Sequence, residues 1–123
     1  MTNQEILALL QSIDNGYKVS PEEQIKLSLI EEVTFVKVAE LPNSIDLLTN
    51  LKQLTVKNTL ISKLPEAIGN LKKLKKLDLS NTKIKELPEL LCSLPNLETI
   101  DLGATQISEL PDWIDNIQNL RKW

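Results

Sequence analysis

The sequence predicts an α/β solenoid, in which a short parallel sheet is backed by short helices or 3₁₀ turns and a helical cap covers the N-terminal end. Two observations support this fold class. A 23-residue pattern occurs three times, starting at Leu48, Leu71 and Leu94, and a partial copy starts at Ile117. The 47 residues before these copies carry helix-start signals instead. Because so short a unit cannot bury its apolar face alone, neighbouring copies must stack on one another.

Each complete repeat contains a short strand, which is predicted from strict alternation. Apolar residues occupy every second position of Leu54–Val56, Leu77–Leu79 and Ile100–Leu102. Because side chains of an extended chain alternate between its two faces, these residues are expected to point into the core of a parallel sheet. The polar residues between them, expected on the outward face, are Thr55, Asp78 and Asp101.

Each predicted strand is followed by a compact return along the opposite wall of the core. Isoleucines recur five positions after the strand, and a leucine–proline pair follows three positions later, as in Ile61 and Leu64-Pro65. A proline followed by an acidic residue, such as Glu66, is typical of the first turn of a short helix or 3₁₀ segment. The apolar residues expected to bury the underside of that turn are Ile68, Leu91 and Ile114.

A threonine occupies the tight turn after each predicted strand, at Thr59, Thr82 and Thr105. A hydroxyl in such a turn can donate and accept hydrogen bonds, and it can therefore satisfy backbone groups that would otherwise be buried without partners. We interpret these threonines as structural. The alternative, a row of hydroxyls that grips a ligand, requires the three side chains to point outward.

Residues 1–32 are predicted to form the helical cap, and residues 33–123 are predicted to form one continuous repeat domain. Thr2 and Glu5 make a capping box, and an apolar stripe follows, so a helix is expected over residues 3–14. Ser20-Pro21-Glu22-Glu23 is a second start signal, and it predicts a helix that runs to about residue 30. The apolar face expected for this second helix consists of Ile25, Leu29 and Ile30.

The first strand is expected to be irregular, as terminal repeats commonly are. The segment Val33–Val38 has strand character, and Leu41-Pro42 matches Leu64-Pro65 at the 23-residue spacing. In that strict register Val33 matches Val56, and Glu31 falls at the position of Leu54.

Composition predicts a single soluble domain. The chain has 123 residues, a formal net charge of −3 and no run of 18 apolar residues, which argues against nucleic acid as the partner and against a membrane span. Its first residues lack the basic and apolar regions of a signal peptide, so a cytoplasmic location is expected. The chain contains a single cysteine, Cys92, which excludes an intramolecular disulfide and reads as a small turn residue rather than a reactive thiol.

Catalysis and bound cofactors are not expected. The chain has no histidine, which removes the usual nucleophile–histidine pairs and the common zinc sites, and its three glycines are scattered. Asp78 and Asp101 stand in one outward column of adjacent strands, about 4.8 Å apart, near the carboxylate spacing of retaining glycosidases. Three interpretations follow: a catalytic pair, a weak site for a cation or a cationic partner, and a solvated polar row. The last is favoured because the pattern indicates no pocket.

Charge is distributed in bands along the repeats. The segment 71–93 contains three acidic residues and the six lysines Lys72, Lys73, Lys75, Lys76, Lys83 and Lys85, whereas the segment 94–116 contains five acids and no base. A run of lysines is most often a solvated face, and the alternative is a surface that attracts an acidic protein partner.

The three complete copies are LTNLKQLTVKNTLISKLPEAIGN, LKKLKKLDLSNTKIKELPELLCS and LPNLETIDLGATQISELPDWIDN. They resemble leucine-rich repeats, and the LPxxIxNL ending is similar to intracellular repeats of bacterial proteins, of plant Ras-group-related proteins and of disease-resistance receptors. The resemblance covers roughly residues 33–123. It implies a non-enzymatic module that binds a protein through the concave strand face, as part of a larger signalling, effector or sensing protein. The implied partner-binding residues are Gln53, Thr55, Lys57, Lys76, Asp78, Ser80, Thr99, Asp101 and Gly103.

A strand face of this size is short of the roughly 20–30 residues per side that a standard stable interface uses. The alternative function is therefore a structural or self-assembling repeat element with no separate ligand. Trp123 falls in the column of Leu54, Leu77 and Ile100, where a further strand would begin. Because an uncovered parallel edge can pair with another chain, self-association through the edge near Trp123 is a possible outcome.

Overall fold

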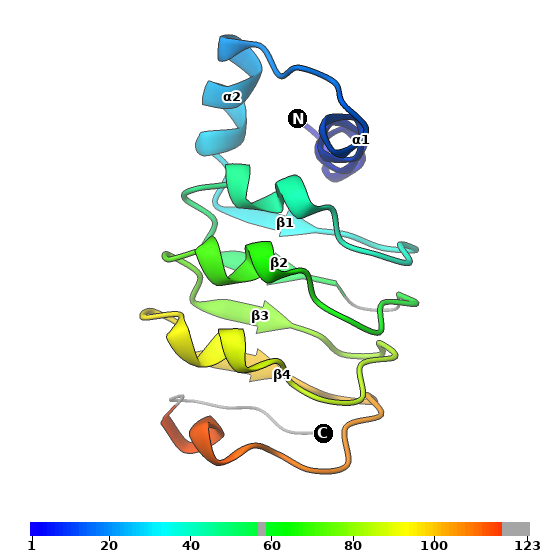
Figure 1. The fold of residues 1–123 in the computed structure, drawn as a ribbon, viewed down its shortest axis with the longest axis vertical. Helices are drawn as coiled ribbons and strands as arrows, with labels where there is room; N and C mark the ends of the chain where they lie inside the picture. The colour runs from blue at the N-terminus through cyan, green and yellow to red at the C-terminus, as the bar shows by residue number, and fades with distance from the viewer. Residues whose placement is uncertain (57–58, 117–123) are drawn as a thin grey trace.

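The computed structural model of the protein describes residues 1–56 and 59–116. Two helices, α1 (Asn3–Asp14) and α2 (Pro21–Ser28), precede a stack of repeats (Figure 1). The strands β1 (Glu32–Thr34), β2 (Gln53–Thr55), β3 (Lys76–Asp78) and β4 (Thr99–Asp101) form a parallel sheet in that order. The 3₁₀ segments η1 (Asn43–Leu47), η2 (Glu66–Asn70), η3 (Glu89–Ser93) and η4 (Asp112–Asn116) form the opposite wall. The α/β solenoid predicted from the sequence is confirmed.

The core lies between the two walls and is built from aligned columns. Leu54, Leu77 and Ile100 are consecutive partners in the register of the sheet, and all three are buried. On the other wall Ile68, Leu91 and Ile114 are buried beneath the 3₁₀ segments, as predicted. Stacking thus gives each coil the apolar neighbours that it lacks alone.

The first repeat differs from the expected register. Val33 pairs with Leu54 rather than with Val56. The amide of Leu60 donates to the carbonyl of Val38 at 3.1 Å, as the amide of Lys83 donates to the carbonyl of Ile61 at 2.9 Å, so Val38 takes the position of Ile61. The turn after β1 is therefore two residues shorter than in the other repeats. A 23-residue count back from Val56 cannot detect this deletion, because Leu41-Pro42 still matches Leu64-Pro65.

The threonine turns have the structural role that the sequence predicts. Each hydroxyl donates to the carbonyl three residues earlier: Thr59 to Val56 at 3.0 Å, Thr82 to Leu79 at 2.8 Å, and Thr105 to Leu102 at 3.0 Å. Thr59 and Thr82 are buried. These side chains therefore close the turn and are directed away from any ligand on the surface.

Both cap helices begin at capping boxes, one made by Thr2 with Glu5 and the other by Ser20 with Glu23. Helix α1 matches the predicted range, and α2 ends two residues earlier than expected. Its expected apolar face is wrong at two of three positions: Ile25 is 61% exposed and Leu29 is 70% exposed. Ile30 packs partly buried against the core, as expected, and Leu27 is fully buried. Because helix positions advance by about 100° per residue, Ile25 and Leu29 each lie roughly 200° away from Leu27.

Helix α1 is tied to both walls of the first repeat. At its N-terminal end Asn3 Oδ1 accepts a hydrogen bond from the amide of Thr34 on β1, at 3.2 Å. At its C-terminal end Asp14 accepts from the amides of Asn43 and Ser44, at 2.7 and 2.9 Å, where η1 begins. The buried hydroxyl of Ser44 donates back to the carbonyl of Leu10 at 2.7 Å. The cap therefore supplies hydrogen-bond acceptors to both walls of the first repeat.

Candidate protein-binding surface

The outward side of the sheet carries two polar columns, which the register defines. Glu32, Gln53, Lys76 and Thr99 are consecutive partners at the start of each strand. Thr34, Thr55, Asp78 and Asp101 are consecutive partners at the end of each strand. In Figure 1 the strands lie side by side in one sheet, and the 3₁₀ segments lie against its other side. The sheet therefore brings together most of the predicted partner-binding residues.

Accessibility differs within these columns. Lys76 is exposed, and Gln53 and Thr99 are partly exposed, so the first column can be contacted by another molecule. Thr55 lies in the outward column, but the expectation that it is accessible is wrong, because it is only 7% exposed. Thr55 lies between Thr34 and Asp78 in the register, and its short side chain lies below the surface. Lys57, another predicted contact, lies outside the described residues.

The two aspartates of the second column are bonded to their own chain. Asp78 Oδ1 accepts hydrogen bonds from the amide and the hydroxyl of Ser80, at 2.9 and 2.6 Å. Asp101 Oδ1 accepts from the amide of Gly103 at 3.0 Å. In each case the carboxylate holds the turn that precedes a left-handed residue, Asn81 or Ala104. The carboxylates therefore shape the turns at the end of the strand face.

Gly103 fits closely against this arrangement. A Cβ atom at position 103 would lie 3.3 Å from Asp101 Oδ1 and 3.8 Å from the Cβ of Ser80. Position 103 therefore has little room for a larger side chain. Ser80 and Gly103 contribute to the turns after the strands more than to an open surface. Among the described residues, no group of three His, Cys, Asp or Glu side chains is placed to hold a metal ion.

The margin of the sheet just before the strands is charged, and of its residues only Lys76 is among the nine predicted contacts. Lys52 Nζ lies 2.8 Å from Glu31 Oε1 in an exposed ion pair. The hydrogen bond from Lys52, followed by its charge and by that of Lys73, lowers the pKa of the Glu31 carboxyl. Lys75 and Lys76 are exposed beside this pair. The sequence signal that could have identified this margin is the 23-residue spacing of Lys52, Lys75 and Glu98, which places the three residues in one column.

Two other lysines of the band are engaged on their own chain. Lys72 Nζ donates to the carbonyl of Gly69 at 2.8 Å, and Lys73 Nζ donates to Asn50 Oδ1 at 2.6 Å. Their charge remains at the surface, but their orientation is set by the turns that precede the strands. The predicted lysine band therefore contains two kinds of side chain. Lys72 and Lys73 are hydrogen-bonded to their own chain, and Lys75 and Lys76 extend into solvent.

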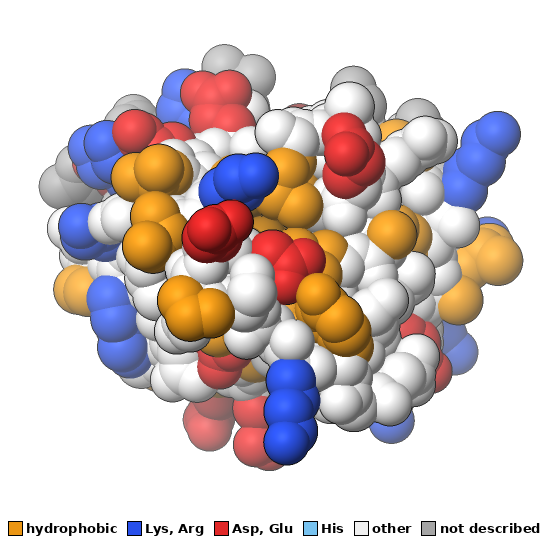
Figure 2. Space-filling view, turned by 90° about the horizontal axis from the view of Figure 1, so that it is seen from above, with side chains coloured by type: hydrophobic (Ala, Val, Ile, Leu, Met, Phe, Trp, Pro, Cys, Tyr) orange, Lys and Arg blue, Asp and Glu red, His pale blue; other side chains and the backbone are white. Residues whose placement is uncertain are grey.

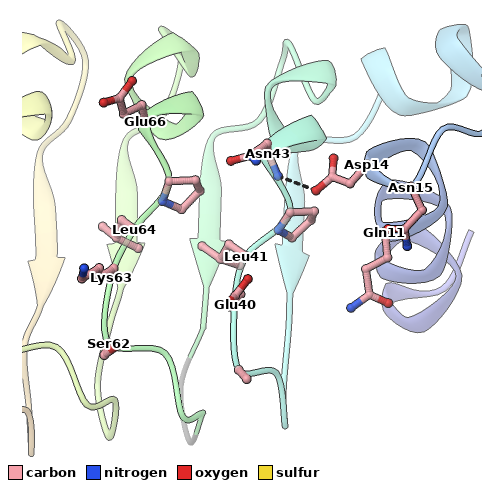
Figure 3. Close-up of a pocket in the computed structure, with 13 residues that line it drawn as sticks. Gln11, Asp14, Asn15, Glu40, Leu41, Asn43, Ser62, Lys63, Leu64 and Glu66 are labelled. Atoms are coloured by element: carbon pink, nitrogen blue, oxygen red, sulfur yellow. Dashed lines mark hydrogen bonds between the residues drawn. The ribbon is translucent and has the colours of Figure 1, made fainter.

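A groove lies between the C-terminal end of α1 and the turns of the first two repeats (Figure 3). Its walls combine Asp14 and Gln11 from α1 with Glu40, Lys63 and Glu66 from the turns. Asp14 already accepts two backbone hydrogen bonds there. The remaining charges are mixed in sign, and the groove has no convergent set of polar groups of the kind that fixes a small molecule.

The cap end carries exposed apolar side chains. Figure 2 views the molecule from this end and shows hydrophobic side chains interspersed with charged ones. Tyr17, Ile25 and Leu29 are exposed in the cap.

The single cysteine, Cys92, is exposed on η3, on the wall opposite the strands. Within the described ranges, no helix has both the length and the apolar composition that crossing a bilayer requires.

Parallel strands on one wall, 3₁₀ turns on the other and an accessible polar strand face define a solenoid repeat protein. The family model described as a leucine-rich repeat region matches residues 27–122, and the chain belongs to this family. Members of the family are in general interaction modules rather than enzymes. A search of curated protein sequences returned no match.

Two solved structures of bacterial leucine-rich repeat proteins resemble this fold. One is a leucine-rich repeat protein of Leptospira interrogans, with 25% identity and a TM-score of 0.66 over 89% of this chain and 34% of the other. The second is an internalin of Listeria monocytogenes, with 27% identity and a TM-score of 0.63 over 81% of this chain and 29% of the other. The chain therefore spans about a third of the length of each.

Proposed function

We propose that the protein is an interaction module that binds a protein partner through the outward face of β1–β4. The observation that supports this most strongly is the first polar column, in which Gln53, Lys76 and Thr99 stand side by side on a sheet backed by its own core. The backbone positions that carry these side chains are fixed before a partner arrives, which lowers the entropy cost of binding.

The face available within the chain is small. Because Thr55 is buried and the two aspartates are bonded to their own turns, fewer side chains are available than the nine that the sequence predicted. A stable interface uses roughly 20–30 residues per side, so binding through this face alone is expected to be weak. We therefore place the module within a larger signalling, effector or sensing protein, in keeping with the greater length of the two structural relatives.

The test is a pair of matched double variants. Gln53→Tyr with Thr99→Tyr places two bulky uncharged side chains on the strand face, and Ser62→Tyr with Ser108→Tyr places them on exposed residues near the leucine–proline turns, with the same spacing in sequence. Proteins captured from native lysate by the wild type are quantified by mass spectrometry. We expect the specific partner to be lost with the first variant and kept with the second. If the first variant keeps every partner, the strand-face assignment is wrong and the cap becomes the candidate.

The alternative function is a structural or self-assembling repeat element. Its predicted contact near Trp123 lies outside the described residues. Trp113, on η4, packs partly buried against the core, which leaves only part of its indole accessible.

The expected cytoplasmic location also stays a prediction, and fractionation of the native cells would test it.

A further inference from the structure

The margin of the strand face points to the chemistry of the partner. We infer that Lys52, Lys75 and Lys76 recognise a short protein segment that carries two neighbouring carboxylates. This inference rests on the proposed function and makes it more specific, because the three lysines border the same polar columns.

Backbone hydrogen bonds place four charged residues in one row across the solenoid. The amide of Lys52 donates to the carbonyl of Glu31 at 2.7 Å, Lys75 to Lys52 at 2.8 Å, and Glu98 to Lys75 at 2.9 Å. Neighbouring strands lie about 4.8 Å apart, so the charges follow one another closely in the order negative, positive, positive, negative. Lys76 adds a third positive charge beside the centre of this row.

The positive charge at the centre of the row is only partly neutralised by its surroundings. Lys75 and Lys76 are exposed, and within residues 1–56 and 59–116 neither has a carboxylate within the 4.0 Å of a salt bridge. Asp78, on the same strand, accepts its hydrogen bonds from Ser80. Lys52 has one partner, Glu31, at 2.8 Å. Two cations are thus available, and a third is only partly neutralised.

The order of charges disfavours a second copy of this chain as the occupant. A two-fold axis along the row places each residue against its own copy, and a two-fold axis across the centre of the row places Glu31 against Glu98 and Lys52 against Lys75. Like charges meet in both cases, and such a contact is unfavourable. A continuous polyanion such as nucleic acid would extend beyond the lysines on to the glutamates at both ends. A short acidic segment meets only the lysines.

The first experiment uses two synthetic peptides, Ac-Gly-Glu-Gly-Glu-Gly-NH₂ and its glutamine counterpart, titrated into the ¹⁵N-labelled protein. Alternation places both glutamates on one side of an extended peptide. We expect shifts of the amides of Lys52, Lys75 and Lys76 with the acidic peptide only, and binding about tenfold weaker when ionic strength rises from about 20 mM to about 300 mM. Shifts that map elsewhere, or that are equal for the two peptides, overturn the inference.

Matched variants separate local recognition from net charge. Lys75→Gln with Lys76→Gln removes two charges at the margin, and Lys83→Gln with Lys85→Gln removes two exposed charges of the same repeat beyond the strand. We expect about tenfold weaker peptide binding for the first pair and a change within about twofold for the second. An equal loss in both pairs would show that only net charge matters and would overturn the inference.

Binding of the native partner to the two strand-face variants distinguishes a failure of this inference from a failure of the proposed function. If the partner binds the Lys75→Gln, Lys76→Gln variant with unchanged affinity but is lost with Gln53→Tyr, Thr99→Tyr, the strand face is the binding surface and the acidic-segment inference is wrong. If both variants keep the partner, the proposed function itself fails.

Discussion

Asp78 and Asp101 occupy outward positions, yet each directs a carboxylate oxygen at the turn that follows its own strand. The sequence pattern predicts which face a residue belongs to, because alternation fixes that face. It does not predict whether the side chain bends back to the main chain, because this depends on the turn geometry two residues later. For this reason the sequence-based list of contact residues includes side chains that are also hydrogen-bonded within their own turns.

This finding changes the expected effect of replacing Asp78. Asp78→Asn keeps an oxygen that can accept from Ser80, so the free energy of unfolding should change by about 0.5 kcal/mol or less. Asp78→Ala removes the acceptor and should destabilise the protein by about 1–2 kcal/mol. Urea denaturation of both variants provides the measurement. Equal and negligible effects would show that the carboxylate is a freely solvated group.

The centre of the core is tested at Leu77, which is 1% exposed. Leu77→Ala removes buried methyl groups and leaves a cavity between two neighbouring coils, so we expect a loss of about 2–5 kcal/mol. Chemical denaturation measures it directly. A loss smaller than about 1 kcal/mol would contradict the burial of this position.

At the scale of elements, the cap is held by a few polar contacts that can be removed singly. Asp14→Ala deletes the acceptor for the amides of Asn43 and Ser44 at the start of η1. By comparison with helix N-caps, the cost should be about 0.5–2 kcal/mol. Hydrogen exchange should show faster opening of α1 and η1, with β3 unchanged. Uniform acceleration through all repeats would show that the cap and the solenoid unfold as one unit.

The capping box of α2 gives the cap a pH dependence. The Ser20 amide, followed by the hydroxyl of Tyr17, donates to Glu23 and holds its pKa below the ordinary value of 4.5. Since the folded-state pKa is the lower one, the stabilisation is present above pH 4.5 and is lost as pH falls through the folded-state pKa. NMR titration of Glu23 should show this depressed pKa. Glu23→Gln should reduce the acid dependence of cap opening.

The helices, strands and turns show how much of the fold can be predicted from the sequence. Capping boxes predicted the starts of both helices, and the 23-residue period predicted the later strands, because these signals are local or repeated. The rotation of α2 was not predictable from its apolar residues, since Leu27 alone is fully buried and the exposed Ile25 and Leu29 suggest a different face. The shortened turn between Phe35 and Val38 was also missed, because a single irregular repeat provides no period to count.

At the scale of the molecule, the stack is extended and each coil contacts mainly its neighbours. Sedimentation velocity over a hundredfold range of concentration tests the predicted self-association. A sedimentation coefficient that rises with concentration is expected if the edge near Trp123 pairs with another chain, and Trp123→Ser should then abolish the rise. A constant monomeric value throughout would contradict this prediction.

Helix α1 also acts as a spacer across the first coil. Its 12 residues extend roughly 18 Å, from the tie between Asn3 and β1 to the tie between Asp14 and η1. One inserted residue would turn Asp14 by about 100° relative to Asn3 and break one of the ties, whatever its side chain. The length of this helix is therefore constrained independently of its composition, by the separation of the two ties.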